Sequence, residues 1–224
     1  MGNPTPASAG LIAIYERLFG KYGPQDWWPA DTAFEMMIGA ILTQSTAWSN
    51  VEKAITGLKS AGALSAAQIR RMRPEELAPV IRSSGYYNAK ASKLKALADW
   101  LAGYDDDIES LKDRDPAEFR RELLAVHGVG PETADSILLY ALDVPVFVID
   151  AYTRRLFSRL GIVPPRDTYD EWQRLFETNL EQQAGLFNEY HALIVRHAKE
   201  VCRSRPDCAE CCLAGECRYL KRGY

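Results

Sequence analysis

Residues 123–142, LLAVHGVGPETADSILLYAL, decide the fold of this chain. Apolar residues recur at helical spacing on both sides of the turn His127–Pro131, and two glycines in the turn can adopt positive φ without steric cost. Asp115, which precedes a proline, and Pro131 are both favourable helix starts. The segment therefore predicts two helices joined by a tight hairpin.

The hairpin turn exposes backbone amides beside a helix N-terminus, and amides so placed can hold a phosphate oxygen. Binding of a phosphate by backbone amides does not require a strongly basic surface. This matters because the net charge of the chain is −3 and its pI is about 5.7, so any contact with nucleic acid must be local. The alternative is a plain helical hairpin whose glycines only permit the turn.

The rest of the chain also reads as helical, since no run of alternating β-branched residues indicates a strand. Thr32 and Glu35 predict a capping box at the start of one helix. Another helix is expected to begin at Asp150 and to end near Gly161. No apolar stretch approaches the roughly 18 residues of a membrane span, and the N-terminal segment does not resemble a signal peptide. We expect an all-α, cytoplasmic protein.

The hairpin segment and the sequence VFVIDAYTRRL at residues 146–156 together resemble the helix-hairpin-helix DNA glycosylases of the endonuclease III superfamily. The resemblance implies two helical domains. The first is a six-helix domain with the hairpin at residues 27–144, and the second comprises residues 1–26 and 145–224 with a C-terminal iron–sulfur loop.

In that superfamily the aspartate at the start of the helix after the hairpin is catalytic, and this position is Asp150 here. An ionised carboxylate can stabilise the oxocarbenium-like sugar formed when an N-glycosidic bond breaks, and it can orient the attacking water. The alternative is that Asp150 serves only as a helix N-cap. The resemblance also implies that Gly128, Val129 and Gly130 contact the DNA backbone.

Superfamily members that also cut the strand carry a lysine two residues after the second hairpin glycine, where this chain has Glu132. A carboxylate cannot form a Schiff base with the sugar. The departure predicts a monofunctional glycosylase whose AP lyase activity is absent or weak. Glu132 also favours a helix N-terminus electrostatically, which is its alternative role.

The sequence Trp27-Trp28-Pro followed by FEMMIGAILTQSTAW at residues 34–48 resembles the 3-methyladenine DNA glycosylase III branch. Members of the branch hold the extruded base between a tryptophan of this motif and an aromatic residue shortly after LTQ. The resemblance implies that Trp27 and Trp48 hold the extruded base. It also implies that Trp28 and Glu132 belong to the base pocket. Cationic alkylpurines such as 3-methyladenine suit a tryptophan pocket, because aromatic faces attract cations. Packing in the core is the alternative role of these tryptophans.

The sequence GYYNAKA at residues 85–91 resembles the turn that wedges into the gap left by the flipped base. The resemblance implies Tyr86 as the wedge, with Asn88 as a further DNA contact. It also implies that Gln44 fills or probes the opposite strand. An ordinary loop aromatic and a polar core residue are the respective alternatives for Tyr86 and Gln44.

All five cysteines lie between positions 202 and 217, and clustering of this kind indicates a metal site. Four of them have the spacing C-x5-C-x2-C-x5-C, namely Cys202, Cys208, Cys211 and Cys217. This pattern is close to that of endonuclease III but one residue shorter in its first gap. A [4Fe–4S] cluster is expected, with tetrahedral zinc as the alternative. Cys211 fits the spacing better than its neighbour Cys212.

The cysteine loop is expected to be structural and to present Arg203, Arg205 and Arg218 toward DNA. The sequence thus predicts a DNA glycosylase for alkylated, cationic purines that binds damaged double-stranded DNA as a monomer, with no membrane association. We expect a nucleoid-associated protein of bacterial or archaeal type. The alternatives are an endonuclease III-like glycosylase for oxidised pyrimidines or mismatched bases, and a non-catalytic module that binds DNA damage.

Overall fold

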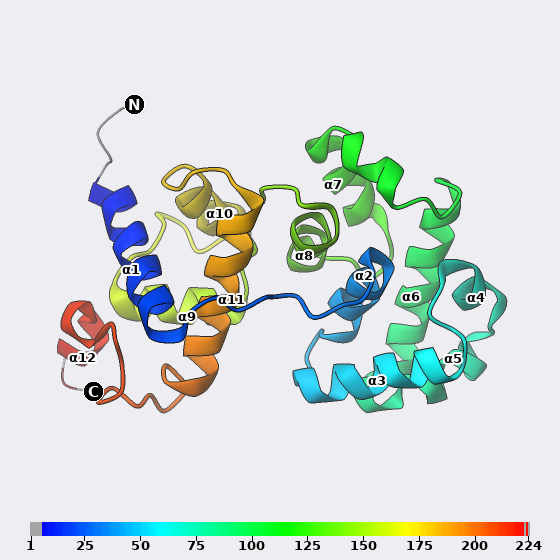
Figure 1. Ribbon diagram of the computed structural model, residues 1–224, viewed down its shortest axis with the longest axis horizontal. Helices are drawn as coiled ribbons and strands as arrows, with labels where there is room; N and C mark the ends of the chain where they lie inside the picture. The colour runs from blue at the N-terminus through cyan, green and yellow to red at the C-terminus, as the bar shows by residue number, and fades with distance from the viewer. Residues whose placement is uncertain (1–5, 222, 224) are drawn as a thin grey trace. The chain divides into compact units, whose positions relative to one another are not determined.

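A computed structural model describes residues 6–221 and 223, and all regular secondary structure within these residues is helical (Figure 1). The prediction of an all-α fold is confirmed. The chain divides into two compact units, one formed by Trp28–Val144 and the other by Met1–Trp27 together with Pro145–Tyr224.

The unit Trp28–Val144 is built around helix α2, whose residues from Glu35 to Leu42 are all buried. Helix α2 packs against α8, α3 and α6. The helical segments of this unit are α2 (Ala33–Leu42), α3 (Trp48–Ser60), α4 (Ala66–Arg71), α5 (Pro74–Val80), η1 (Arg82–Ser84), α6 (Tyr87–Ala102), η2 (Glu109–Asp113), α7 (Pro116–Ala125) and α8 (Pro131–Leu142).

The other unit has helix α11 at its centre, packed against α1 and α9. Its helical segments are α1 (Pro6–Tyr22), α9 (Ala151–Leu160), α10 (Tyr169–Glu177), α11 (Ala184–Glu200), η3 (Ala214–Glu216) and α12 (Arg218–Lys221). Aromatic rings fill its core. Phe147 stacks on Phe176 with ring centroids 4.0 Å apart, and the buried Tyr190 hydroxyl donates to the carbonyl of Leu11 at 2.7 Å.

The ends of several helices agree with the sequence analysis. The hydroxyl of Thr32 accepts a hydrogen bond from the amide of Glu35 at 3.1 Å, which is one half of the predicted capping box. The other half is not formed, because the Glu35 carboxylate pairs with Lys59 at 2.9 Å. The carboxylate of Asp115 caps α7 in the same way, and Gly161 ends α9 with a φ of 81°. Local side-chain contacts therefore fix these helix boundaries.

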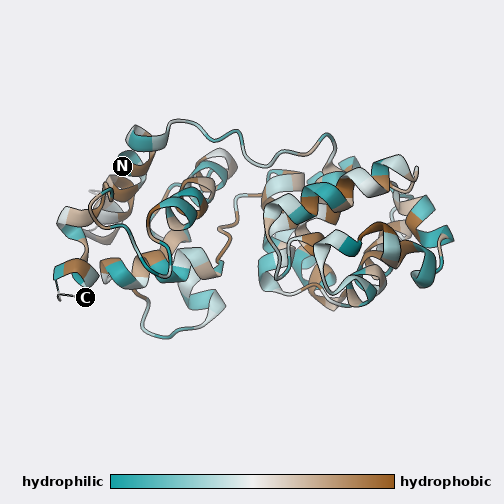
Figure 2. Cartoon of the chain, turned by 90° about the horizontal axis from the view of Figure 1, so that it is seen from below, coloured by the Kyte–Doolittle hydropathy of each residue, from teal (hydrophilic) through white to brown (hydrophobic). Residues whose placement is uncertain are grey.

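Most helices carry both hydrophilic residues, drawn in teal, and hydrophobic residues, drawn in brown (Figure 2). Amphipathic helices of this kind bury one face against their neighbours. No helix within the described residues is both long enough and apolar enough to cross a membrane.

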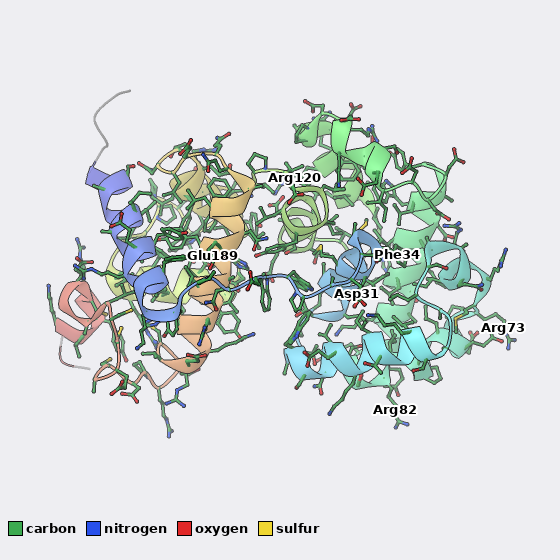
Figure 3. The ribbon with its side chains drawn as sticks, in the orientation of Figure 1. Asp31, Phe34, Arg73, Arg82, Arg120 and Glu189 are labelled. Carbon is green, nitrogen blue, oxygen red and sulfur yellow. The ribbon has the colours of Figure 1, made fainter. Side chains whose placement is uncertain are left out.

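The two helices of the hairpin are joined by an ion pair below the turn. Arg120 of α7, labelled in Figure 3, contacts both carboxylate oxygens of Asp135 of α8, at 2.6 and 3.0 Å. The Asp135 side chain is fully buried, whereas that of Arg120 is 25% exposed. A bidentate pair of this type holds the two helices in one relative position, so the turn between them has a fixed base.

Replacing Asp135 by alanine should lower the free energy of unfolding by about 3 kcal/mol, because it leaves a largely buried guanidinium without its carboxylate. Chemical denaturation measures this change. Glu109→Ala is the matched control, since it removes an exposed carboxylate that pairs with Lys112 at 2.7 Å. Exposed pairs contribute little, so the control should unfold almost as the wild type does. Equal denaturation midpoints for the two variants would contradict the prediction.

Candidate active site and hairpin

Asp150 lies at the N-cap of α9 with extended backbone angles. One carboxylate oxygen, Oδ1, accepts the amide of Thr153 at 2.7 Å, so the capping role is confirmed. The other oxygen, Oδ2, lies 3.6 Å from Nε2 of His191 on α11, and Asp150 as a whole is 9% exposed. Capping uses only one of the two oxygens, and it is therefore compatible with a catalytic role.

The surroundings of Asp150 favour its ionised form. Burial is the largest single influence and would raise the pKa of Asp150, but His191 and the contacts from Thr153 together outweigh it and lower the pKa below its ordinary value. Burial also lowers the pKa of Lys199, and the negative charge of Asp150 opposes that change. Asp150 is thus a carboxylate at neutral pH, because its contacts with His191 and Thr153 favour the charged form.

His191 was not foreseen by the sequence analysis. It lies 41 residues after Asp150 in the chain, and a histidine among the apolar residues of α11 carries no signal of a role. Only the packing of α11 against α9 brings the two side chains together.

The C-terminal half of α9 is attached to the cysteine loop by two arginines. Arg155 donates to the carbonyls of Ala198 and Cys202 at 2.8 and 3.0 Å. Arg159 donates to the carbonyl of Arg203 at 2.7 Å and lies 3.2 Å from the Cys202 sulfur. These bonds satisfy carbonyls in the last turn of α11 and just beyond it, and they hold the start of the loop against α9.

The four cysteines selected by their spacing line one cavity, whereas Cys212 does not. Apolar side chains that include Leu156 and Leu213 complete its wall. In the described part of the chain, no three His, Cys, Asp or Glu side chains are arranged so that they could hold a metal ion. The exposed Arg203, Arg205 and Arg218 lie on the same loop or just after it.

The hairpin turn is anchored by Val129, which is buried between two glycines. The amide of Val129 donates to the carbonyl of Val126 at 3.1 Å, and Gly128 has a φ of 82°. Gly130 is the N-cap of α8 and is exposed. Because the first amides of a helix have no partner within it, the turn presents donors that suit an anion.

Gln44, which follows α2, is engaged with this turn. Its Nε2 donates to the carbonyl of Gly128 at 3.1 Å and to Oγ1 of Thr133 at 2.9 Å. Its Oε1 accepts from Nζ of Lys93 at 2.6 Å. The stem of Lys93 occupies the space beside Gly128, where an added Cβ would lie 2.3 Å from Lys93 Cγ. Lys93 lies two residues beyond the GYYNAKA motif, and the sequence carries no signal of its contact with the hairpin.

Lys90, from that motif, is a buried cation that joins two turns. Its Nζ donates to the carbonyls of Leu42 and Ser84 at 2.9 and 2.6 Å. Burial, followed by the charge of Lys93, lowers the pKa of Lys90 to about 8. The segment that precedes Gln44 and the segment that precedes Tyr86 are therefore held together by one side chain.

Tyr86 is 76% exposed and has a left-handed backbone, with φ of 46° and ψ of 32°. A bulky residue in this region is strained, and strain of this kind is often found at functional positions. Asn88, in the first turn of α6, is also exposed. The turn thus displays an aromatic side chain and an amide to solvent.

In the unit Trp28–Val144, three aromatic residues form a half-buried cluster. Trp28 meets Trp48 edge to face with ring centroids 5.0 Å apart, and Trp28 lies 5.3 Å from Tyr140 of α8. Gly39 of α2 leaves room for the Trp28 ring. Trp27 belongs to the other unit. Glu132 is exposed in the first turn of α8. Tyr140 carried no sequence signal, because its partners come from other elements.

The two hairpin glycines should differ in their tolerance of substitution. Gly128→Ala should lower the free energy of unfolding by about 1 to 3 kcal/mol, because it places a Cβ at positive φ and against the Lys93 stem. Gly130→Ala is the control, since φ is −97° and no atom lies within 4 Å of the new Cβ. Thermal unfolding measures both variants, and equal losses of stability would contradict the assignment.

The lowered pKa of Asp150 gives a defined pH dependence. A carboxyl group with a depressed folded-state pKa contributes stability above the unfolded value, about 3.9, and that stability is lost as pH falls through the folded value. The unfolding free energy of the wild type relative to Asp150→Asn should therefore be constant from about pH 7 to pH 5 and fall below about pH 4. Denaturation at several pH values measures the difference. A difference that grows in favour of the wild type as pH falls would contradict the prediction.

Comparison with known proteins agrees with this geometry. Residues 38–182 match the HhH-GPD superfamily of base excision DNA repair proteins. A candidate DNA repair glycosylase of Methanocaldococcus jannaschii is 47% identical over 203 residues, which cover 90% of this chain and 92% of that protein. Endonuclease III of Sulfolobus acidocaldarius is 29% identical over 188 residues, which cover 83% of this chain and 82% of that protein.

Solved structures share the fold. The H. pylori 3-methyladenine DNA glycosylase bound to 1,N6-ethenoadenine has a TM-score of 0.72 and 30% identity, covering 88% of this chain and 98% of that chain. A trapped covalent intermediate of endonuclease III with DNA has a TM-score of 0.82 and 22% identity, covering 96% of this chain and 97% of that chain. The chain therefore belongs to the HhH-GPD superfamily of base excision DNA repair proteins and is a DNA glycosylase of that family.

Proposed function

We propose that this glycosylase excises alkylated, cationic purines such as 3-methyladenine and leaves the DNA strand uncut. The observation that carries the proposal is the aromatic cluster in which Trp28 lies against Trp48 and Tyr140, at 5.0 and 5.3 Å. A positively charged purine gains roughly 0.5 to 2 kcal/mol from an aromatic face, depending on how far it is desolvated.

The similarity to the H. pylori enzyme supports this choice of substrate. That protein is a 3-methyladenine DNA glycosylase, and its structure contains a modified adenine. Its 30% identity with this chain extends over 88% of the chain. A pocket that accepts a modified purine is therefore consistent with both the aromatic cluster and the relationship.

Asp150 is proposed to be the catalytic residue. Its lowered pKa keeps it ionised, so its carboxylate can stabilise the positive charge that develops on the sugar as the base leaves. A purine alkylated on a ring nitrogen is already a good leaving group. The enzyme then needs a placed carboxylate more than a strong general acid.

Glu132 supports base excision without strand cleavage. It occupies the first turn of α8, where a carboxylate cannot supply the amine needed for a Schiff base. We propose that it borders the base pocket, where its negative charge favours a cationic base and also the N-terminus of α8.

The turns of the unit Trp28–Val144 are proposed to bind the DNA. The turn of Gly128, Val129 and Gly130 would hold the backbone phosphate through the amides of its two glycines, because the amide of Val129 already donates to Val126. The exposed Tyr86 would enter the gap left by the extruded base, with Asn88 close to it in the same turn. Gln44 would reach the opposite strand.

Release of bases from methylated duplex DNA tests the proposal directly. The wild type should release 3-methyladenine, and Asp150→Asn should lower the single-turnover rate by at least about 100-fold, because the stabilising charge is lost. Borohydride treatment on abasic DNA should trap little covalent adduct.

A chain that releases thymine glycol and no methylated base would instead be a glycosylase for oxidised pyrimidines, the second candidate, which the relationship to endonuclease III favours. Strong covalent trapping would overturn the monofunctional assignment.

We also infer that the cysteine loop holds a [4Fe–4S] cluster. The ligands would be Cys202, Cys208, Cys211 and Cys217. All four line one cavity with apolar walls, and four cysteines that share one such space are the ligand set of a [4Fe–4S] cluster. The cluster would supply a cross-link that orders the loop, and it would take no part in base excision.

Serine substitutions at the adjacent cysteines test the ligand set. Cys211→Ser should lower the iron and sulfide content below the roughly four of each expected per chain, whereas Cys212→Ser should leave it unchanged. Metal analysis and visible absorption measure both. One equivalent of zinc in the wild type, with no iron, would favour the tetrahedral zinc site and contradict the cluster.

A further inference from the structure

The side chain of Gln44 is held at both of its ends. Lysine has only donors, so the amide oxygen of Gln44 must face Lys93 and its nitrogen must face Gly128 and Thr133. The three distances, 2.6, 3.1 and 2.9 Å, leave the amide in a single orientation. The half-buried Gln44 is therefore docked on the hairpin and is not extended into solvent.

The position of Lys93 is itself fixed by the hairpin. Its stem crosses Gly128 so closely that no Cβ could stand there. The charged end is thereby directed to the place where the hairpin meets the segment after α2. A hydrogen bond from a charged donor is stronger than one between neutral groups, so Lys93 makes the strongest of the three contacts to Gln44.

This arrangement conflicts with a side chain that is already positioned for DNA. A glutamine amide cannot keep its contacts with Lys93, Gly128 and Thr133 and also enter a duplex. These contacts must break before Gln44 can reach the opposite strand. On undamaged, stacked DNA there is no gap to offset that loss, whereas at an extruded or missing base there is.

We propose that Lys93 is a positioning residue that holds Gln44 on the hairpin in the free protein and sets the free-energy cost of its insertion into DNA. The inference rests on the proposed role of Gln44. Lys93 would act only through Gln44, and it would limit insertion on every duplex that offers a gap.

The test compares the dissociation constants for undamaged duplex and for a duplex with one tetrahydrofuran abasic-site analogue. We define the ratio as the dissociation constant for undamaged duplex divided by that for the abasic duplex, so a larger ratio means a stronger preference for the gap. Losing a positive charge weakens binding to both duplexes, and this general effect cancels in the ratio. Lys93→Met keeps the stem over Gly128 and removes the ammonium. It should raise the ratio about three- to tenfold, as expected for loss of a charged hydrogen bond at a half-exposed site.

The same substitution made in a protein that lacks the Gln44 side chain shows whether Lys93 acts through Gln44. Gln44→Ala alone should lower the ratio, and adding Lys93→Met to it should produce no further change. Thr133→Val removes a different contact to Gln44 and should raise the ratio in the same direction as Lys93→Met. It keeps the proposal testable if Lys93→Met folds poorly.

Lys112→Met is the charge-matched control, because it removes an exposed lysine on η2 and should leave the ratio unchanged. The proposal is overturned if Lys93→Met leaves the ratio unchanged or lowers it, or if it has the same effect in the Gln44→Ala background. An unchanged ratio for Gln44→Ala alone also overturns it, since Gln44 would then not insert. The abasic analogue has no base to excise, so failure of the alkylpurine assignment would not affect this result.

Discussion

A carboxylate that stays ionised while nearly buried is the constraint on which the unit around α9 depends. Asp150 loses most of its contact with water, and this loss alone would favour the neutral acid. The amide of Thr153, three residues along the same helix, and the imidazole of His191 offset it, and the contact with His191 depends on the placement of α9 against α11. At its other end, α9 is attached through Arg155 and Arg159 to the carbonyls that begin the cysteine loop. The loop that carries the thiols therefore also restrains the helix that carries the carboxylate.

In the unit Trp28–Val144, three turns are held in fixed positions relative to one another. They are the hairpin, the turn at Gln44 and the turn at Tyr86. Turns leave backbone carbonyls without helical partners, and the buried Lys90 satisfies two of them, those of Leu42 and Ser84. Lys90 joins the segments before Gln44 and before Tyr86, while Lys93 joins Gln44 to the hairpin. Both lysines lie on α6, one turn apart. The strained backbone of Tyr86 at the start of the same helix is thus supported by a rigid element, and the three turns can meet DNA as one surface.

The sequence was sufficient wherever the decisive interaction is local. The helix starts at Thr32, Asp115 and Asp150 depend on a side chain that accepts a hydrogen bond from an amide three residues later. Such caps can be predicted from a few consecutive residues. The hairpin could be predicted because only glycine occupies φ near 82° without strain. The spacing of the cysteines likewise singled out the four that line the cavity, since a loop this short brings residues at those intervals around one space.

An all-helical fold, the hairpin, the capping position of Asp150 and the composition of the cysteine loop could all be predicted from the order of the residues alone. The tertiary structure decided which distant side chains complete these features. It brought His191 to Asp150, placed Tyr140 beside Trp28, and docked Gln44 on the hairpin through Lys93. The physical reason is that each of these contacts joins elements that are far apart in the chain. Their partners are chosen by how amphipathic helices pack, and that packing depends on the whole apolar surface of each helix rather than on any local pattern of residues.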